Sequence, residues 1–316
     1  MPILCPPPFR KMAAIRFLAI VLLLPFAACK AQPGPKSGPS RAADFKDIAY
    51  ATVSPAQKLD VYLPATGKKP FPVIVSIHGG AFMFGDKADG QVNPMLEAMK
   101  RGYAVVSINY RLSGEAIFPA QIHDVKAAIR WVRAQADTYG FDSARIAVWG
   151  GSAGGHLSAL AGVSGDVAAL EDLSLGNAGF SSRVHAVVDW FGPIDFLTMD
   201  EQFSQSGKGK PDHSLAGSPE SKLLGAQITT VPELVAKASP ASYITSDDPP
   251  FFIQHGTIDH LIPTAQSEAF AAALVTVLGK EKVTLSLLEG ADHGGPAFDA
   301  PANVALVLDF LDATLK

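Results

Sequence analysis

The spacing of apolar residues along the chain alternates between continuous runs and a helical period. Runs such as VIVSI and AVVSI are apolar almost throughout, which is typical of strands covered on both faces of a parallel sheet. These and similar runs predict strands at 45–52, 58–63, 71–77, 104–109, 145–149, 184–191, 250–255 and 283–288. Only a short polar segment joins the first two, which therefore fit an antiparallel start of the sheet.

Helical periodicity fills the intervals between several of these strands. Ile122, Val125, Ile129 and Val132 are spaced three and four residues apart and form one apolar stripe. The predicted helices include 121–138, 264–278 and 301–315. Because strands and helices alternate, we expect right-handed crossovers and an α/β domain, with an eight-stranded, mostly parallel sheet and helices on both faces.

Residues 198–240 interrupt this alternation. They separate two predicted strands by far more chain than a crossover helix needs, and they contain the polar stretch SQSGKGKPDHS. Ser218, followed by Pro219 and Glu220, has the pattern of a helix start. A long insertion in a compact domain is usually functional or disordered, so we expect a small, lid-like insertion here.

The first 29 residues have the pattern of an export signal. Arg10, Lys11 and Arg16 precede an apolar run at 17–28, which is shorter than the ~20 residues that span a bilayer. The sequence Phe-Ala-Ala before Cys29 resembles the lipobox of bacterial lipoproteins. We therefore expect an exported protein that is a periplasmic or membrane-anchored lipoprotein, or else one cleaved nearby and secreted. Translation starts at Met1 or Met12.

A flexible linker at 30–43, rich in proline and glycine, is expected to follow, and the α/β domain to occupy 44–316. Both cysteines, Cys5 and Cys29, lie in the signal, so the mature domain contains no internal disulfide.

Net charge is -4 without a basic run, which argues against a nucleic-acid partner. The sequence contains neither the HExxH motif nor a Cys/His cluster, so no metal or cofactor is implied.

The stretch WGGSAGGH places a serine among glycines. Ser152 lies between a predicted buried strand and a helix, within the pattern Gly-Gly-Ser-Ala-Gly. In this context G-x-S-x-G is typical of the nucleophile elbow, a strained turn that requires small neighbours and exposes the serine hydroxyl. The alternatives are a simple glycine-rich turn or a phosphate loop, but the residues that a phosphate loop needs do not follow.

A serine nucleophile requires a base, and His293 is the best placed of the eight histidines. It lies in a glycine-rich loop after the last strand, at the same sheet edge as Ser152. Asp259, in HGTIDHLIP, follows the preceding strand and is the predicted orienting acid. His260 is a minor alternative as base, and Asp195 as acid. The order Ser152, Asp259, His293 matches α/β-hydrolases.

A loop of the sequence His-Gly-Gly-Ala at 78–81 follows the strand 71–77. It resembles the HGGG oxyanion loop, with Ala81 at the third glycine. Alanine is compatible with this role provided that its backbone angles are ordinary. We expect the backbone N–H groups of Gly80, Ala81 and Ala153 to bind the developing oxyanion.

Together, the blocks SIHGGAF, AVWGGSAGGHLSAL, HGTIDHLIP and EGADHG resemble carboxylesterase-type α/β-hydrolases near the hormone-sensitive-lipase-like group, and most of all the feruloyl-esterase-like BD-FAE family. The resemblance implies the α/β-hydrolase fold and a serine ester hydrolase acting on small-molecule or carbohydrate-linked esters. An amide-cleaving hydrolase and a non-catalytic binding protein remain alternatives.

The substrate preference follows from the residues near this site. Phe82, Met83, Phe84, Trp190 and Phe191 are the candidates to line a compact aromatic pocket. The insertion is polar and lacks the apolar surface of a lipase lid. We therefore expect short-chain or aromatic acyl esters, including acetyl or feruloyl groups on carbohydrate, to be preferred over long-chain lipids. Membrane contact is expected only through a lipid on Cys29.

Overall fold

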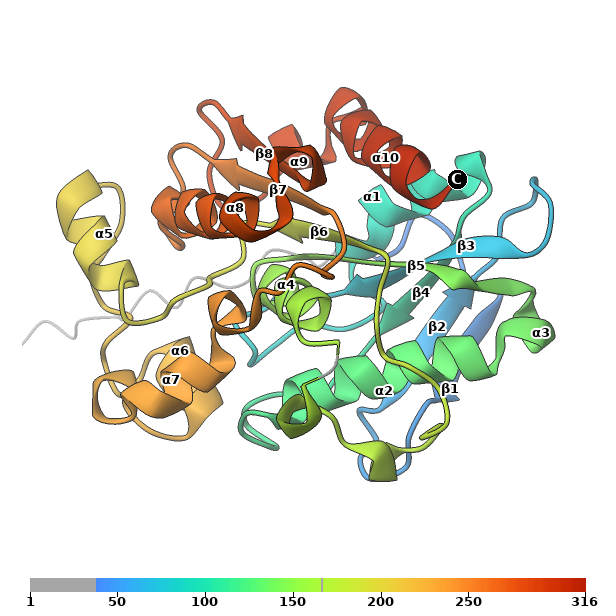
Figure 1. Cartoon of the computed structure of the whole chain (residues 1–316), viewed down its shortest axis with the longest axis horizontal. Helices are drawn as coiled ribbons and strands as arrows, with labels where there is room; N and C mark the ends of the chain where they lie inside the picture. Colours follow the sequence, from blue (N-terminus) through green and yellow to red (C-terminus); the bar gives the residue numbers. More distant parts are fainter. Residues whose placement is uncertain (1–37, 166) are drawn as a thin grey trace, which may run out of the picture. The chain divides into compact units, whose positions relative to one another are not determined.

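A computed structural model describes residues 38–165 and 167–316 of the chain (Figure 1). The predicted export signal at 1–29, Cys29 and most of the linker lie outside the described residues. Eight strands form one sheet in the order β1-β2-β4-β3-β5-β6-β7-β8. Their bounds are β1 Phe45–Ala49, β2 Lys58–Tyr62, β3 Phe71–Ile77, β4 Ala104–Ile108, β5 Phe141–Gly151, β6 Ala186–Trp190, β7 Phe251–Gly256 and β8 Val283–Leu288.

The sheet is mostly parallel, as the sequence predicts. Strand β2 pairs antiparallel with both β1 and β4, and the remaining neighbours pair parallel. Strand β5 is longer than predicted and begins at Phe141, which pairs with Phe71. The first part of β5 was not predicted because it contains the polar residues Asp142 and Ser143 instead of a continuous apolar run. The carboxyl ends of β3, β5, β6, β7 and β8 therefore lie along one edge of the sheet.

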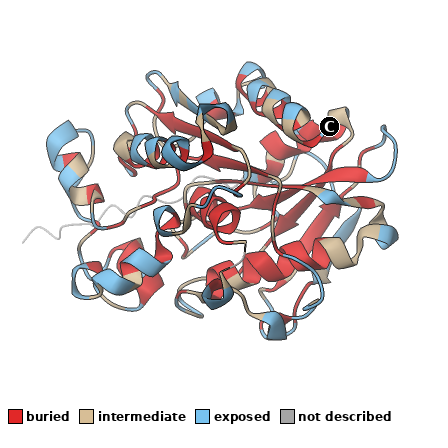
Figure 2. Cartoon of the chain, viewed as in Figure 1, coloured by how far each residue is buried: buried red, intermediate tan, exposed pale blue. Residues whose placement is uncertain are grey.

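The strands separate two apolar cores, one on each face of the sheet. Val73 and Val75 of β3 pack into one core, and the intervening Ile74 packs into the other, as the alternation of strand side chains requires. Strands β3 and β4 are buried along their full length. Figure 2 shows this buried sheet between helices whose outer faces are exposed.

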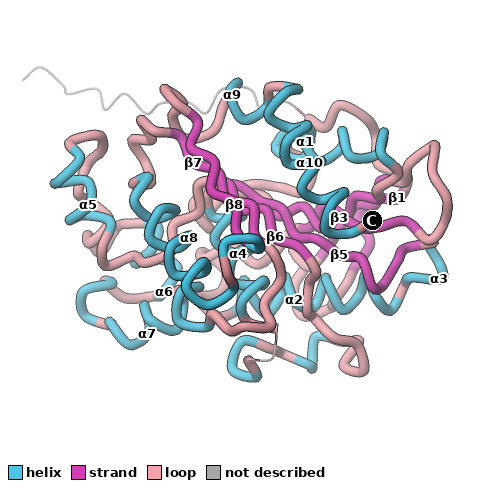
Figure 3. Tube along the Cα trace, turned by 45° about the horizontal axis from the view of Figure 1, so that its top comes forward, coloured by secondary structure: helices cyan, strands magenta, loops and turns pink. Residues whose placement is uncertain are grey.

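Helices cover both faces of the sheet (Figure 3). Helices α2 (Ala120–Ala134), α4 (Ala153–Val163) and α8 (Thr264–Leu278) contribute to one core, and α1 (Asn93–Leu96) and α10 (Pro301–Leu315) to the other. The predicted helix 121–138 is divided: α2 ends at Ala134, and α3 (Ala136–Tyr139) is followed by Gly140, which has a φ of 74°. None of the described helices is long and apolar enough to cross a membrane.

The insertion at 198–240 consists of short helices: α5 Met199–Ser206, α6 Pro219–Leu224, η5 Ile228–Thr230 and α7 Pro232–Ala238. Ser218 caps α6 by accepting a hydrogen bond from the backbone N–H of Ser221, as predicted. The polar stretch between α5 and α6 is tied back, because Asp200 accepts hydrogen bonds from the N–H groups of His213 and Ser214. The remaining short helices are η1 Gly90–Val92, η2 Glu97–Arg101, η3 Ala168–Leu170, η4 Leu173–Leu175, η6 Pro240–Tyr243, η7 Lys280–Lys282 and α9 Pro296–Asp299.

The described end of the predicted linker contacts the domain. The N–H of Ser40 donates to Asn93 Oδ1 at 2.6 Å, and Arg41 forms an ion pair with Asp44. Ala43 packs against the core on the α10 side. Contacts with the domain therefore begin before residue 44.

Candidate active site

Ser152 occupies a sharp turn between β5 and α4. Its φ of 58° and ψ of -124° lie outside the regions that non-glycine residues favour, at a cost of ~1–3 kcal/mol. The neighbours must be small: a Cβ on Gly154 would lie 2.1 Å from the carbonyl oxygen of Ile77, and one on Gly150 would lie 2.4 Å from the backbone of Gly154. The local geometry is that of the predicted nucleophile elbow.

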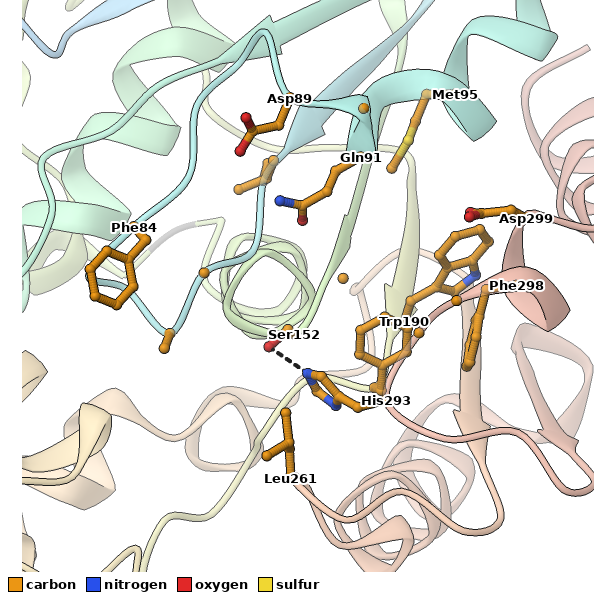
Figure 4. A pocket seen from close by; sticks show the side chains of 18 residues that line it. Phe84, Asp89, Gln91, Met95, Ser152, Trp190, Leu261, His293, Phe298 and Asp299 are labelled. Carbon is orange, nitrogen blue, oxygen red and sulfur yellow. Dashed lines mark hydrogen bonds between the residues drawn. The ribbon is translucent and has the colours of Figure 1, made fainter. Parts of the chain in front are cut away.

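The structure brings together the three side chains that the sequence predicts. His293 Nε2 lies 2.9 Å from Ser152 Oγ, and its Nδ1 lies 2.7 Å from Asp259 Oδ2. A carboxylate accepts only, so Nδ1 carries a hydrogen and Nε2 is left to accept the serine proton. Figure 4 shows the imidazole of His293 directed at the serine hydroxyl. The arrangement can transfer a proton from Ser152 to His293.

Asp259 is held by hydrogen bonds to both of its oxygens. Its Oδ1 accepts from the backbone N–H groups of Leu261 and Ile262, each at 2.8 Å. Burial on its own raises the pKa of Asp259, but hydrogen bonds from His255 and His293 outweigh burial and hold this pKa well below its ordinary value. Asp259 therefore stays ionised and can stabilise a charged imidazole.

His255, at the end of β7, is a residue that the sequence interpretation missed. It is fully buried, and its Nε2 lies 3.2 Å from Asp259 Oδ2 and 3.0 Å from the carbonyl oxygen of Ile262. Both of these groups accept, so Nε2 is the donor, and Nδ1 accepts from Ser267 Oγ at 2.7 Å. The spacing of four residues between His255 and Asp259 in the sequence HGTID is the signal that points to this contact.

The alternative residues lie elsewhere. His260 is exposed and pairs with Asp292, with 2.6 Å between Nδ1 and Oδ1. Asp195 accepts from the N–H of Leu197 in the loop after β6. His156 is buried in α4 against Phe82, and burial lowers its pKa to about 4, so it is an uncharged packing residue.

The loop after β3 faces Ser152, but its conformation differs from the expectation. Ala81 has a φ of 56°, in the left-handed region, and Gly80 has a φ of 116°. The backbone angles of Ala81 are therefore not ordinary, and the loop keeps a glycine-like path with an alanine in it. The N–H groups of Met83 and Phe84 both donate to the carbonyl oxygen of Gly80, which closes the loop.

Gly80 and Ala81 both line the cavity beside Ser152. Ala153 is buried and is the first residue of α4. The backbone N–H groups at a helix start have no acceptor within the helix, so that of Ala153 points out of its end. These positions are compatible with the predicted oxyanion hole.

A cavity of about 610 Å³ opens over Ser152. One part of its wall is aromatic and contains Trp190, Phe191 and Phe298. The prediction of an aromatic pocket was wrong for two residues: Phe82 is buried in the core, and Met83 is not among the residues that line the cavity. Met83 instead lines a different pocket, beside Gly85 and Asn109.

Polar side chains line other parts of the same cavity. Asp89 and Gln91 come from the segment after the oxyanion loop, and Asp299 comes from α9. Burial raises the pKa of Asp299. Within residues 38–165 and 167–316, no three His, Cys, Asp or Glu side chains are grouped so as to hold a metal ion.

The fold and the elbow define the class of this protein, an α/β-hydrolase. The sequence profile of the BD-FAE family matches residues 59–274, and the chain belongs to the BD-FAE family. Esterase LipQ of Mycobacterium tuberculosis is 37% identical over 84% of this chain and 61% of its own length. The probable carboxylic ester hydrolase LipM of the same organism is 33% identical over 80% and 56%. The chain thus spans less than two thirds of these relatives.

Solved structures share the fold. A truncated carbohydrate esterase from gut microbiota has a TM-score of 0.77 and 35% identity, over 88% of this chain and 99% of that chain. Esterase 2 of Thermogutta terrifontis, in a form phosphorylated by paraoxon, has a TM-score of 0.65 and 26% identity, over 84% and 92%. These likenesses agree with the fold and the family.

Proposed function

We propose that the protein is a serine ester hydrolase, a carboxylesterase that works through an acyl-enzyme. The observation that carries the proposal is the hydrogen-bonded chain from Ser152 Oγ through His293 to Asp259, placed at the floor of a cavity. The named esterases among its relatives support the same reaction.

The geometry is compatible with each step of this reaction. His293 Nε2 removes the proton of Ser152 while Oγ attacks the ester carbonyl carbon, and Asp259 stabilises the imidazolium that forms. Negative charge on the carbonyl oxygen is met by the backbone N–H groups of Gly80, Ala81 and Ala153. His293 then protonates the leaving alcohol, the C–O bond breaks, and water repeats the sequence to release the acid.

We propose that the acyl part of the substrate is short or aromatic, and that carbohydrate-linked acetyl or feruloyl esters are among the substrates. The aromatic wall of Trp190, Phe191 and Phe298 suits a compact acyl group. A further methylene gains ~0.8 kcal/mol only where it is buried, so long chains that extend beyond the cavity gain nothing.

A series of para-nitrophenyl esters tests both proposals. Catalytic efficiency is expected to be highest for acetyl or butyryl esters and to fall with chain length. Ser152→Ala and His293→Ala are expected to lose at least ~10⁴-fold in turnover, whereas the matched control His260→Ala, on an exposed histidine paired with Asp292, keeps its rate. A maximum at the lauroyl ester contradicts the substrate proposal, and an active Ser152→Ala contradicts the reaction.

Amide cleavage and non-catalytic binding are the alternative functions. No contact among residues 38–165 and 167–316 favours either function. A fluorophosphonate probe separates binding from catalysis, because only an activated serine reacts with it. Comparison of an acetyl ester with the matching acetamide separates the two enzyme classes.

We also propose that the protein is exported and carries lipid on Cys29. The support is the sequence before Cys29 and the proline- and glycine-rich segment after it. Mass spectrometry of the native N-terminus tests this proposal. A diacylglyceryl Cys29 is the expected result, and an unmodified N-terminus downstream of Cys29 contradicts lipidation.

A further inference from the structure

The polar wall of the cavity has a donor whose orientation is fixed. Gln91 Oε1 accepts the backbone N–H of Gly79 at 2.9 Å. Only the oxygen of an amide accepts a hydrogen bond, so the two N–H bonds of Gln91 Nε2 are directed away from Gly79. Because Gln91 lines the cavity, these donors are available to a molecule bound there (Figure 4).

Gln91 is also close to the predicted nucleophile. A Cβ built on Gly79 would lie 3.0 Å from Gln91 Oε1 and 3.3 Å from Ser152 Cβ. The amide oxygen of Gln91 and the side chain of Ser152 therefore both lie next to Gly79. A group bound to Nε2 is consequently adjacent to the ester that Ser152 attacks.

Asp89 supplies an acceptor beside this donor. It precedes η1, lines the same cavity, and its Oδ2 accepts the backbone N–H of Asp86 at 3.0 Å. A carboxylate has about four acceptor positions and can accept hydrogen bonds from several donors at once. Figure 4 shows Asp89 and Gln91 on the same wall of the cavity, with Trp190 and Phe298 grouped apart from Asp89.

We propose that Asp89 and Gln91 form a subsite that binds a free hydroxyl group on the alcohol part of the substrate, next to the acylated oxygen. The hydroxyl accepts from Gln91 Nε2 and donates to the Asp89 carboxylate. The acyl group then lies against Trp190, Phe191 and Phe298. The inference rests on the proposed ester hydrolysis and assigns its alcohols to vicinal diols, the arrangement found in sugars.

Two esters that differ by one hydroxyl group test the subsite: the monoacetate of the trans vicinal cyclohexanediol, and cyclohexyl acetate. The quantity measured is the ratio of their kcat/KM values. Two hydrogen bonds, one of them to a charged group, lead us to expect that the wild-type ratio favours the diol ester by about tenfold or more.

Gln91→Met removes the donor, and Asp89→Asn removes the charged acceptor with almost no change of shape. Each is expected to lower the ratio several-fold, because each removes one of the two hydrogen bonds. Gln91→Met also removes the hydrogen bond to the N–H of Gly79. That second effect slows hydrolysis of both esters alike, so it does not contribute to the change in the ratio. Glu97→Gln is the matched control: Glu97 is exposed on η2, pairs with Lys100 and does not line this cavity, so its ratio remains that of the wild type.

The failures are distinguishable. If the wild type hydrolyses para-nitrophenyl acetate but does not prefer the diol ester, or if both variants keep the preference, the subsite is wrong and the proposed function stands. If the wild type hydrolyses no ester, the proposed function is wrong, and the subsite fails with it.

Discussion

One oxygen of Asp259 faces two histidines, because Oδ2 lies 2.7 Å from His293 Nδ1 and 3.2 Å from His255 Nε2. Only His293 also reaches Ser152. His255 is fully buried, and its Nδ1 accepts a hydrogen bond from Ser267 Oγ. We infer that His255 positions the acid and takes no part in proton transfer.

His255→Phe is therefore expected to lower kcat by about tenfold to a hundredfold, with little change in KM. The substitution removes one of the hydrogen bonds that orient Asp259, and small displacements of catalytic groups have effects of this size. It also raises the pKa of Asp259, because the hydrogen bond from His255 lowers that pKa in the wild type. Steady-state kinetics with para-nitrophenyl acetate measure the change.

Ser267→Ala is the milder companion variant, because it removes only the donor to His255 Nδ1. We expect a smaller loss in kcat than in His255→Phe. Wild-type kcat in His255→Phe, with a fold confirmed by circular dichroism, contradicts a positioning role.

Gly154→Ala is expected to damage both the fold and the activity. The new Cβ would lie 2.1 Å from the carbonyl oxygen of Ile77, so α4 must move away from the end of β3. Overpacking of this kind commonly costs 1–3 kcal/mol of folding free energy, about the range expected here. Gly217→Ala is the matched control, because nothing lies within 4 Å of its Cβ position. Urea unfolding compares them, and equal stability of the two variants contradicts the close contact.

Ala81 tests the conformation of the oxyanion loop. Its φ of 56° is unfavourable for a residue with a Cβ, by ~1–2 kcal/mol, and more so for a β-branched residue. Ala81→Gly is therefore expected to keep full activity, and Ala81→Val to lose most of it. The kcat/KM values of the two purified variants with para-nitrophenyl acetate measure this difference. Equal activity of both variants means that the backbone N–H groups of this loop are not needed in one fixed geometry.

Asp189 gives a stability test with a defined pH window. It is fully buried on β6; burial raises its pKa from 3.8 to about 6, although a hydrogen bond from the N–H of Gly192 opposes this shift. The folded state thus favours the protonated form. The stability that this group contributes is full below its ordinary pKa and is lost as the pH rises through about 6.

Asp189→Asn does not titrate, so its free energy of unfolding relative to the wild type should rise with pH. The expected gain is up to ~3 kcal/mol between about pH 4 and pH 7, with no further change above. Urea unfolding of both proteins across this range measures it. A difference that is independent of pH contradicts a raised pKa at Asp189.

The parts of the molecule that the sequence predicted well have strong local signals. The buried runs of β3 and β4 indicate a parallel sheet, and the glycines around Ser152 are required by contacts with Ile77 and with the helix itself. The order Ser152, Asp259, His293 then identifies residues at one sheet edge. Each of these predictions depends on residues that are close in sequence, or on the known order of the catalytic residues along the chain of α/β-hydrolases.

The features that were missed depend on contacts between distant segments. The polar start of β5 becomes a strand only because Phe141 pairs with Phe71. Gln91 faces the cavity because it binds Gly79. Likewise, the tight turn at 80–84 places Phe82 in the core, where it meets His156. Apolar spacing carries no information about such partners.

The role of Ser152 as the nucleophile is tested most directly by reaction with paraoxon, followed by mass spectrometry of the intact protein and of its peptides. We expect one diethylphosphoryl group, located on Ser152, and a matching loss of esterase activity. We also expect no labelling of Ser152→Ala and much slower labelling of His293→Ala, because the base that activates the serine is absent. Labelling at another residue, or unchanged labelling of Ser152→Ala, would contradict the assignment of Ser152 as the nucleophile.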